Sequence, residues 1–158
     1  MDYAFENRER MLDKVCDVVK GHIERYAGLS VSFSDQINCH HNYAALENHY
    51  DANVWVHRKG ATKVRQGELA VIPGAMGSYS YVVEGKGNPE AFCTSSHGAG
   101  KSYSRIGAMQ MFTTEQVIVD LKEKGVILGK RKKNDVAEEC RFTYKDIDKV
   151  IPKLFHIQ

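Results

Sequence analysis

The chain reads Ser95-Ser96-His97-Gly98-Ala99-Gly100-Lys101-Ser102 beyond its midpoint, a run of small residues that holds one imidazole and one cation. Because small side chains leave the backbone accessible, successive N–H groups in such a run can form a concave site for an anion. Lys101 could neutralise a phosphate there, and His97 could attack one. Taken alone, the segment is equally consistent with a flexible surface turn of glycine and serine.

The same segment invites comparison with the phosphate-binding loop GxxxxGK[ST]. Counting back from Gly100, the first glycine of that motif falls at Ser95, so the motif fails. The residues before it do not form an apolar strand, which a phosphate-binding loop requires. A P-loop NTPase is therefore disfavoured.

Length and composition indicate one globular domain. The 158 residues are enough for one hydrophobic core, and we expect a single domain over residues 1–158. The net charge of +2 means that any nucleic acid would have to be held by local basic clusters. One cluster is Lys130-Arg131-Lys132-Lys133, which we interpret as a solvated loop, and the other comprises Arg58, Lys59, Lys63 and Arg65.

Cysteine usage and hydropathy bear on the compartment. The four cysteines are scattered without a CxxC pair, so they do not indicate a disulfide framework. No apolar run approaches the length of a membrane span, and the first residues lack the pattern of a signal peptide. We expect a cytoplasmic protein with no membrane partner.

Hydrophobic spacing predicts an α+β fold, a mixed sheet with flanking helices, without regular βαβ alternation. Helices are expected over residues 1–26, 105–111 and 113–123, with a final helix from residue 144 that Pro152 interrupts. A short helix could begin at residues 44–47. Strands are expected over residues 29–33, 53–57, 68–72, 78–83 and 126–128.

Two further segments carry candidate ligands. In Cys39-His40-His41, neighbouring side chains on an extended chain point to opposite sides, so at most two could share one metal ion. A complete site needs three or four ligands, and an ordinary structural role for both histidines is at least as consistent with the spacing. Pro73-Gly74-Ala75-Met76-Gly77 joins two expected strands, as a tight turn or as a loop against a ligand.

Read together, the segments form an ordered series that resembles the C-terminal part of the RtcB family, the GTP-dependent RNA ligases of tRNA splicing and RNA repair. The series covers the chain nearly end to end, and five motifs in one order are far more specific than any one of them. They are Cys39-His40-His41-Asn42-Tyr43-Ala44, His57-Arg58-Lys59-Gly60-Ala61-Thr62, Ile72-Pro73-Gly74-Ala75-Met76-Gly77, Gly85-Lys86-Gly87-Asn88-Pro89-Glu90 and Ser96-His97-Gly98-Ala99-Gly100.

The resemblance implies a reaction. In this family a histidine takes GMP from GTP as a phosphoramidate in the presence of Mn²⁺, which makes His97 the implied catalytic nucleophile. GMP then passes to an RNA 3′-phosphate, and a 5′-hydroxyl displaces it to join the strands. A 2′,3′-cyclic phosphate is first opened to the 3′-phosphate.

The resemblance also assigns site residues by motif position. His41 matches a Mn²⁺ ligand, and with Asn42 it borders the nucleotide. The residues matching the guanylate-binding positions are Pro73, Gly74, Ala75, Met76, Ser80, His97, Gly98, Ala99, Gly100 and Tyr144.

The chain departs from the family pattern in three ways. Lys101 stands where the family usually has arginine, which keeps the charge but loses the bidentate fork. Ala75 replaces a serine, which removes one hydroxyl. The family's upstream metal-binding motifs and a C-terminal lysine that contacts guanine have no counterpart, so we expect a C-terminal portion or split half of an RtcB-type ligase.

Three hypotheses follow for this chain. The first is a split or fragmentary RNA ligase that needs the upstream part and uses an RNA substrate, with an archease-like activator implied by the family alone. The second is a catalytically inactive GTP- or RNA-binding remnant. The third is an inert truncation product with exposed apolar faces.

Overall fold

The computed structural model describes residues 2–129 and 136–157. The helices are α1 (Asp2–Ala27), α2 (Arg105–Met111), α3 (Thr114–Glu123) and α4 (Ile147–Ile157). The strands are β1 (Asn42–His49), β2 (Ala52–Lys59), β3 (Ala61–Lys63), β4 (Leu69–Ile72), β5 (Tyr81–Glu84) and β6 (Thr94–Ser96). Short 3₁₀ helices lie at Pro89–Ala91, Ala137–Glu139 and Arg141–Thr143. The basic run at residues 130–133 falls outside the described residues.

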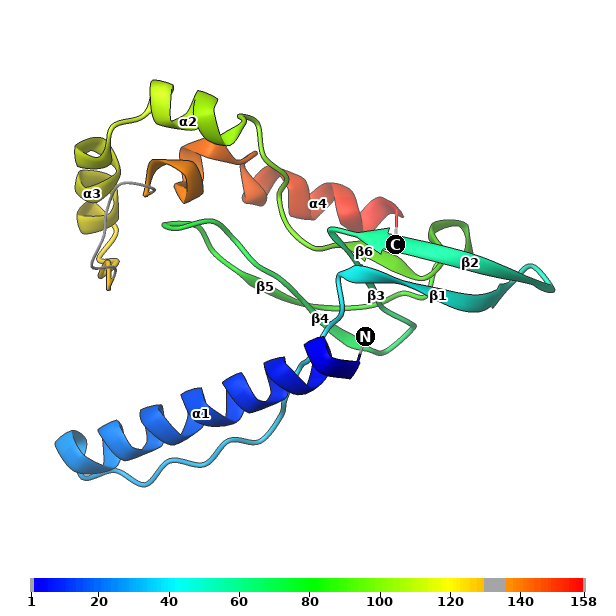
Figure 1. The fold of residues 1–158 in the computed structure, drawn as a ribbon, viewed down its shortest axis with the longest axis horizontal. Coiled ribbons are helices and arrows are strands. Elements are labelled where there is room, and N and C mark those ends of the chain that lie inside the picture. The colour runs from blue at the N-terminus through cyan, green and yellow to red at the C-terminus, as the bar shows by residue number, and fades with distance from the viewer. Residues whose placement is uncertain (1, 130–135, 158) are drawn as a thin grey trace.

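The strands form three two-stranded antiparallel sheets, β1–β2, β3–β6 and β4–β5, so the α+β class is confirmed (Figure 1). The longest is the β1–β2 hairpin, in which all eight residues of β1 pair with β2. Tyr50 and Asp51 turn the chain with φ of 53° and 61°, the left-handed pair that matches strand twist in a two-residue hairpin. The smaller sheets deliver loops: β4 leads into residues 73–76, and β6 leads directly into His97.

Two buried clusters lie around these loops. Ile72 and Ala99 pack with Ile147 and Ile151 of α4, which joins both loops to one helix. The second cluster contains Val117 and Leu121 of α3 together with Val136 and Cys140.

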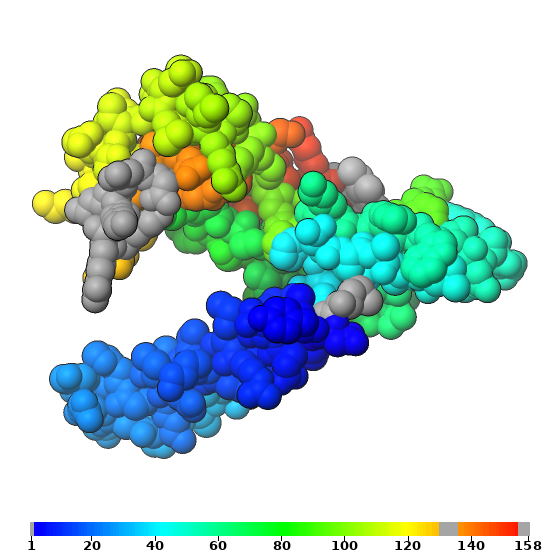
Figure 2. All heavy atoms as spheres, viewed as in Figure 1, coloured from blue at the N-terminus to red at the C-terminus, as the bar shows by residue number. Residues whose placement is uncertain are grey.

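Helix α1 lies apart from the rest of the molecule over most of its length (Figure 2). None of its described residues is buried, and Met11, Val15 and Val18 are each more than half exposed. Near its start, Arg8 donates to the Asn38 side chain at 2.8 Å and lies 3.1 Å from a ring nitrogen of His40. Most of the apolar positions that predicted the helix are therefore exposed in the described structure.

Several element predictions were wrong. Residues 44–47 belong to β1 and not to a helix, because pairing along the whole of β2 outweighs their local propensity. Residues 29–33 and 126–128 form no strand, since neither segment has a hydrogen-bonding partner strand in the described structure. Helix α4 continues through Pro152, because Ile151 before it is buried in the first cluster and Leu154 after it packs against the same cluster.

No helix among the described residues combines the length and apolar character needed to cross a bilayer.

The cap of α3 offers a small, local test. The Thr113 hydroxyl accepts from the Gln116 amide at 3.2 Å, and the Gln116 side chain accepts from the Thr113 amide at 2.9 Å. Replacing Thr113 with alanine is expected to lower the free energy of unfolding by about 1 kcal/mol, because the Gln116 amide in the first turn loses its fixed acceptor. Urea denaturation measures the change, and an unaltered midpoint would mean that water caps the helix equally well.

Candidate functional site

Two loops that are distant in the sequence enclose a pocket of about 350 Å³, within the size range of small-molecule sites. We call it the glycine-loop pocket. It is lined by Pro73, Gly74, Ala75, Met76, His97, Gly98, Ala99, Gly100, Glu139 and Tyr144. Nine of the residues predicted from the sequence therefore lie around one cavity.

The first loop, residues 73–76, is fixed at both ends. The Gly74 amide donates to the Ser80 hydroxyl at 3.1 Å, so Ser80 stabilises the start of the loop. At the other end, the Met76 amide donates to the Glu139 carbonyl at 3.3 Å. A Cβ on Gly74 would lie 2.0 Å from the Tyr79 carbonyl oxygen, so only glycine fits there.

The second loop, residues 97–100, follows β6 and is held through its backbone carbonyls. The Ser96 hydroxyl donates to the Gly98 carbonyl at 2.7 Å, and the Lys145 amide donates to the Gly100 carbonyl at 2.9 Å. Ala99 is buried against Ile72 and α4. The loop is thus anchored on the core while its glycines border the pocket.

His41 and His97 lie face to face. Their ring centroids are 3.8 Å apart and the rings are nearly parallel, with an interplanar angle of 3°. Gly60 connects the two backbones: its amide donates to the His41 carbonyl at 2.8 Å, and its carbonyl accepts from the His97 amide at 3.2 Å. Its φ of 65° is a conformation that side chains disfavour, which accounts for a glycine at this turn.

The environment of His97 favours a neutral ring. Burial lowers the pKa of His97 from its ordinary value, and the neighbouring His41 adds to this effect. Its buried Nδ1 has no hydrogen-bond partner within the part of the chain that the structure describes. A neutral imidazole with an unengaged nitrogen is a potential nucleophile or ligand.

The pocket lining also carries charge that the sequence did not indicate. Glu139 accepts from the Tyr144 hydroxyl at 2.5 Å and forms an ion pair with Lys101 at 2.9 Å. Burial alone would raise the pKa of Glu139, but these hydrogen bonds outweigh it and lower the pKa. Glu139 belongs to no sequence motif. It reaches the pocket because the 3₁₀ turn Ala137–Glu139 is hydrogen-bonded to Met76.

The remaining predicted residues stand outside the pocket lining. His41 touches it only through the ring of His97, and Asn42 begins β1 with an exposed side chain. In the described residues, no group of three histidine, cysteine, aspartate or glutamate side chains gathers in a metal-binding arrangement. His40 lies beside Arg8, and the Cys39 thiol is 3.8 Å from the Leu69 carbonyl.

These features define an α+β protein in which two glycine-containing loops, one of them carrying a partly desolvated histidine, line a pocket of small-molecule size. Residues 1–157 match the family model described as "tRNA-splicing ligase RtcB". The chain belongs to the RtcB family, as its ordered motifs predicted.

Curated relatives agree with this assignment. The "RNA-splicing ligase RtcB" of Escherichia coli (strain K12) is 37% identical over 150 residues, which are 94% of this chain and 36% of that protein. The "tRNA-splicing ligase RtcB" of Pyrobaculum aerophilum is 32% identical over 174 residues, covering 95% and 35%. The "RNA-splicing ligase RtcB" of Mycobacterium tuberculosis is 38% identical over 129 residues, covering 70% and 30%. The chain spans about a third of the length of these relatives.

Proposed function

We propose that this chain carries the nucleotide-transfer histidine of an RtcB-type, GTP-dependent RNA ligase and acts together with the remaining part of such a ligase. The observation that carries the proposal is His97, which is half-buried in the lining of the glycine-loop pocket, with a buried, unengaged Nδ1 and a lowered pKa. Membership of a family whose curated relatives are named RNA-splicing ligases supports the reaction class.

The nucleotide is proposed to be GTP, with the guanylate held in the glycine-loop pocket. The volume of about 350 Å³ and the close approach of backbone at Gly74 suit a flat, polar ligand. Ala75 leaves this loop without the family's hydroxyl, so hydrogen bonding there falls to backbone groups. Tyr144 and Glu139 would supply polar side chains in the lining.

The first step is attack on the α-phosphorus of GTP by a ring nitrogen of His97. A nitrogen–phosphorus bond forms, the bond from the α-phosphorus to the bridging oxygen breaks, and pyrophosphate leaves. The imidazole proton is released as the phosphoramidate forms. The lowered pKa of His97 keeps its ring neutral, and therefore nucleophilic, at neutral pH.

The second part of the reaction concerns RNA. GMP would pass from His97 to an RNA 3′-phosphate, which itself can come from a 2′,3′-cyclic phosphate. Attack by a 5′-hydroxyl then forms the phosphodiester and releases GMP. An archease-like activator stays a proposal drawn from the family alone.

Manganese does not fit a site made of the described residues alone. His41 can contribute one imidazole, and its partner His97 is the proposed nucleophile. Since affinity for such ions rests on several preorganised ligands, the other ligands would have to come from a partner polypeptide. This incomplete donor set also favours the second candidate, a catalytically inactive GTP- or RNA-binding module.

The test is transfer of label from GTP carrying a labelled α-phosphate, with Mn²⁺, to the full chain alone and mixed with the upstream part of the Escherichia coli relative. We expect an acid-labile label on this chain in the mixture, its loss in His97→Ala, and its retention in His22→Ala, a matched histidine exposed on α1. Wild-type protein that remains unlabelled in the mixture while binding GTP would favour the binding module. Label in His97→Ala would refute the role of His97.

A further inference from the structure

Arg58 on β2 is almost completely buried, its side chain only 1% exposed. It forms a two-pronged ion pair with Glu47 on β1: Nη1 donates to Oε1 at 2.5 Å and Nη2 to Oε2 at 3.1 Å. The guanidinium also lies over the ring of Tyr43, its cross-strand partner, at 5.6 Å from the centroid. Arg58 is thereby fixed to the strand that begins directly after His41.

The other donors of Arg58 reach a different segment. Nε donates to the Thr94 hydroxyl at 2.9 Å, and Nη2 donates to the Phe92 carbonyl at 2.8 Å. Phe92 and Cys93 have φ of 52° and 49°, a backbone conformation that is strained for such side chains and persists only where surrounding contacts hold it. Thr94 opens β6, and three residues later the chain reaches His97.

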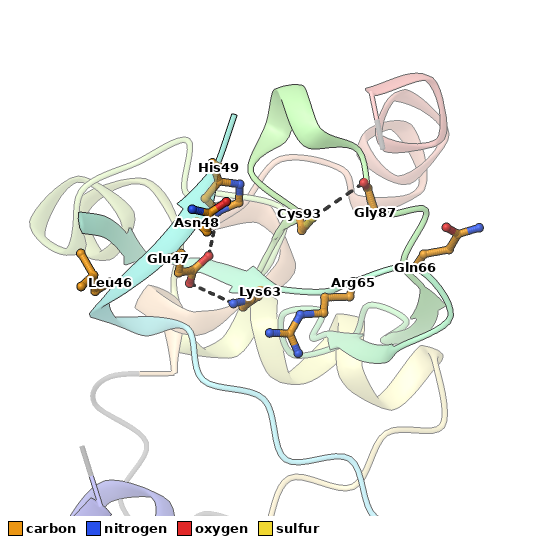
Figure 3. Close-up of a pocket in the computed structure, with 9 residues that line it drawn as sticks. All are labelled: Leu46, Glu47, Asn48, His49, Lys63, Arg65, Gln66, Gly87 and Cys93. Atoms are coloured by element: carbon orange, nitrogen blue, oxygen red, sulfur yellow. Dashed lines mark hydrogen bonds and ion pairs between the residues drawn. The ribbon is translucent and has the colours of Figure 1, made fainter. Parts of the chain in front are cut away.

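Glu47 has two further side-chain partners (Figure 3). Its carboxylate contacts His49 at 2.9 Å and Lys63 at 3.2 Å, beside a second pocket of about 580 Å³. Hydrogen bonding by Arg58 is the main reason that the pKa of Glu47 falls to about 2, so the pair is ionised at every physiological pH. Buried ion pairs add little net stability compared with apolar residues, and their best-attested use is to fix a geometry.

We propose that Arg58, oriented by Glu47, is a positioning residue that sets His41 and His97 face to face. One planar guanidinium bonds to the strand leaving His41 and to the segment entering His97, so a shift of either segment breaks a charge-assisted hydrogen bond. Arg58 touches neither ring and takes no part in the chemistry. The inference rests on the proposed function only for its effect on rate, since the arrangement of the rings can be measured without any reaction.

The test is the nuclear Overhauser cross-peak between the ring protons of His41 and His97 in the full chain, isotope-labelled at histidine. At a centroid separation of 3.8 Å the wild type gives a strong peak. Arg58→Lys keeps the charge but loses the fork, and we expect the peak to vanish while the amide spectrum stays folded. The control Arg65→Lys, in an exposed pair with Glu68, retains it.

If Arg58→Lys does not fold, Thr94→Val is the deciding variant. It removes the hydroxyl that accepts from Arg58 and that also donates to the Phe92 carbonyl within the same segment. A full-strength cross-peak in either folded variant, or none in the wild type, overturns the proposal. In the GMP-transfer assay with the upstream part, Arg58→Lys is expected to lower kcat about 10- to 100-fold with the KM for GTP unchanged. A wild type that accepts no GMP defeats the proposed function, whereas the cross-peaks still decide the role of Arg58.

Discussion

Gly74→Ala is expected to lower the free energy of unfolding by about 3 kcal/mol and to abolish nucleotide binding in the glycine-loop pocket. The added Cβ would lie 2.0 Å from the carbonyl oxygen of Tyr79 and 2.9 Å from its carbon, and backbone atoms cannot swing aside as a flexible side chain can. The loop must therefore move, and its bond to the Ser80 hydroxyl is lost. Urea denaturation and GTP titration measure the two effects.

Gly21→Ala is the matched control for that substitution. Gly21 lies within α1, and a Cβ there meets no atom within 4 Å. Alanine is the better helix former, so this variant is expected to gain about 0.5–1 kcal/mol and to bind GTP as before. If Gly74→Ala kept both its stability and its GTP affinity, close backbone packing at Gly74 would not define the pocket.

The two loops of the pocket were predictable because their signals are local. Glycines follow both His97 and Pro73, and such runs of small residues indicate an accessible backbone, although each run alone is also consistent with a turn. Spacing alone left open whether residues 73–76 and 97–100 lie together. The order of the motifs, through the family resemblance that it carries, predicted that they do. The structure brings these loops to one cavity and stacks His41 on His97.

The polar partners of those loops were not predictable, since each depends on tertiary pairing. Residues 44–47 resemble the start of a helix, yet as part of β1 they place Glu47 four residues from Tyr43 on the same inner face. Arg58 is buried, and is not part of a basic surface cluster, because it bonds to this face of β1 and to the segment that leads into β6. Glu139 likewise has no signal in its neighbours, because it reaches the pocket through pairing of the residues after it with Met76.

The second large effect is a loss of stability in acid through Glu47. Its pKa falls from an ordinary 4.5 to about 2, mainly through hydrogen bonding to Arg58, and its side chain is only 6% exposed. Between pH 2 and pH 4.5 the Glu47 carboxyl is more often protonated in the unfolded state than in the folded state. The free energy of unfolding therefore rises with pH over this range. The stabilisation is complete above pH 4.5 and disappears as the pH falls through about 2, a change of about 3 kcal/mol.

Glu47→Gln separates this contribution from general acid unfolding. The variant leaves Arg58 buried without its counter-charge, so at pH 7 we expect a loss of about 3 kcal/mol, and the part of the acid slope due to Glu47 disappears. Glu6→Gln, whose pair with Arg10 on α1 is exposed, is expected to change the free energy by less than about 0.5 kcal/mol. Urea denaturation at several pH values between 2 and 7 measures both variants. If the free energy of unfolding fell equally steeply in acid for Glu47→Gln and the wild type, the prediction would be contradicted. Ionisation of Glu47 beside Arg58 would then not stabilise the folded state relative to the unfolded chain.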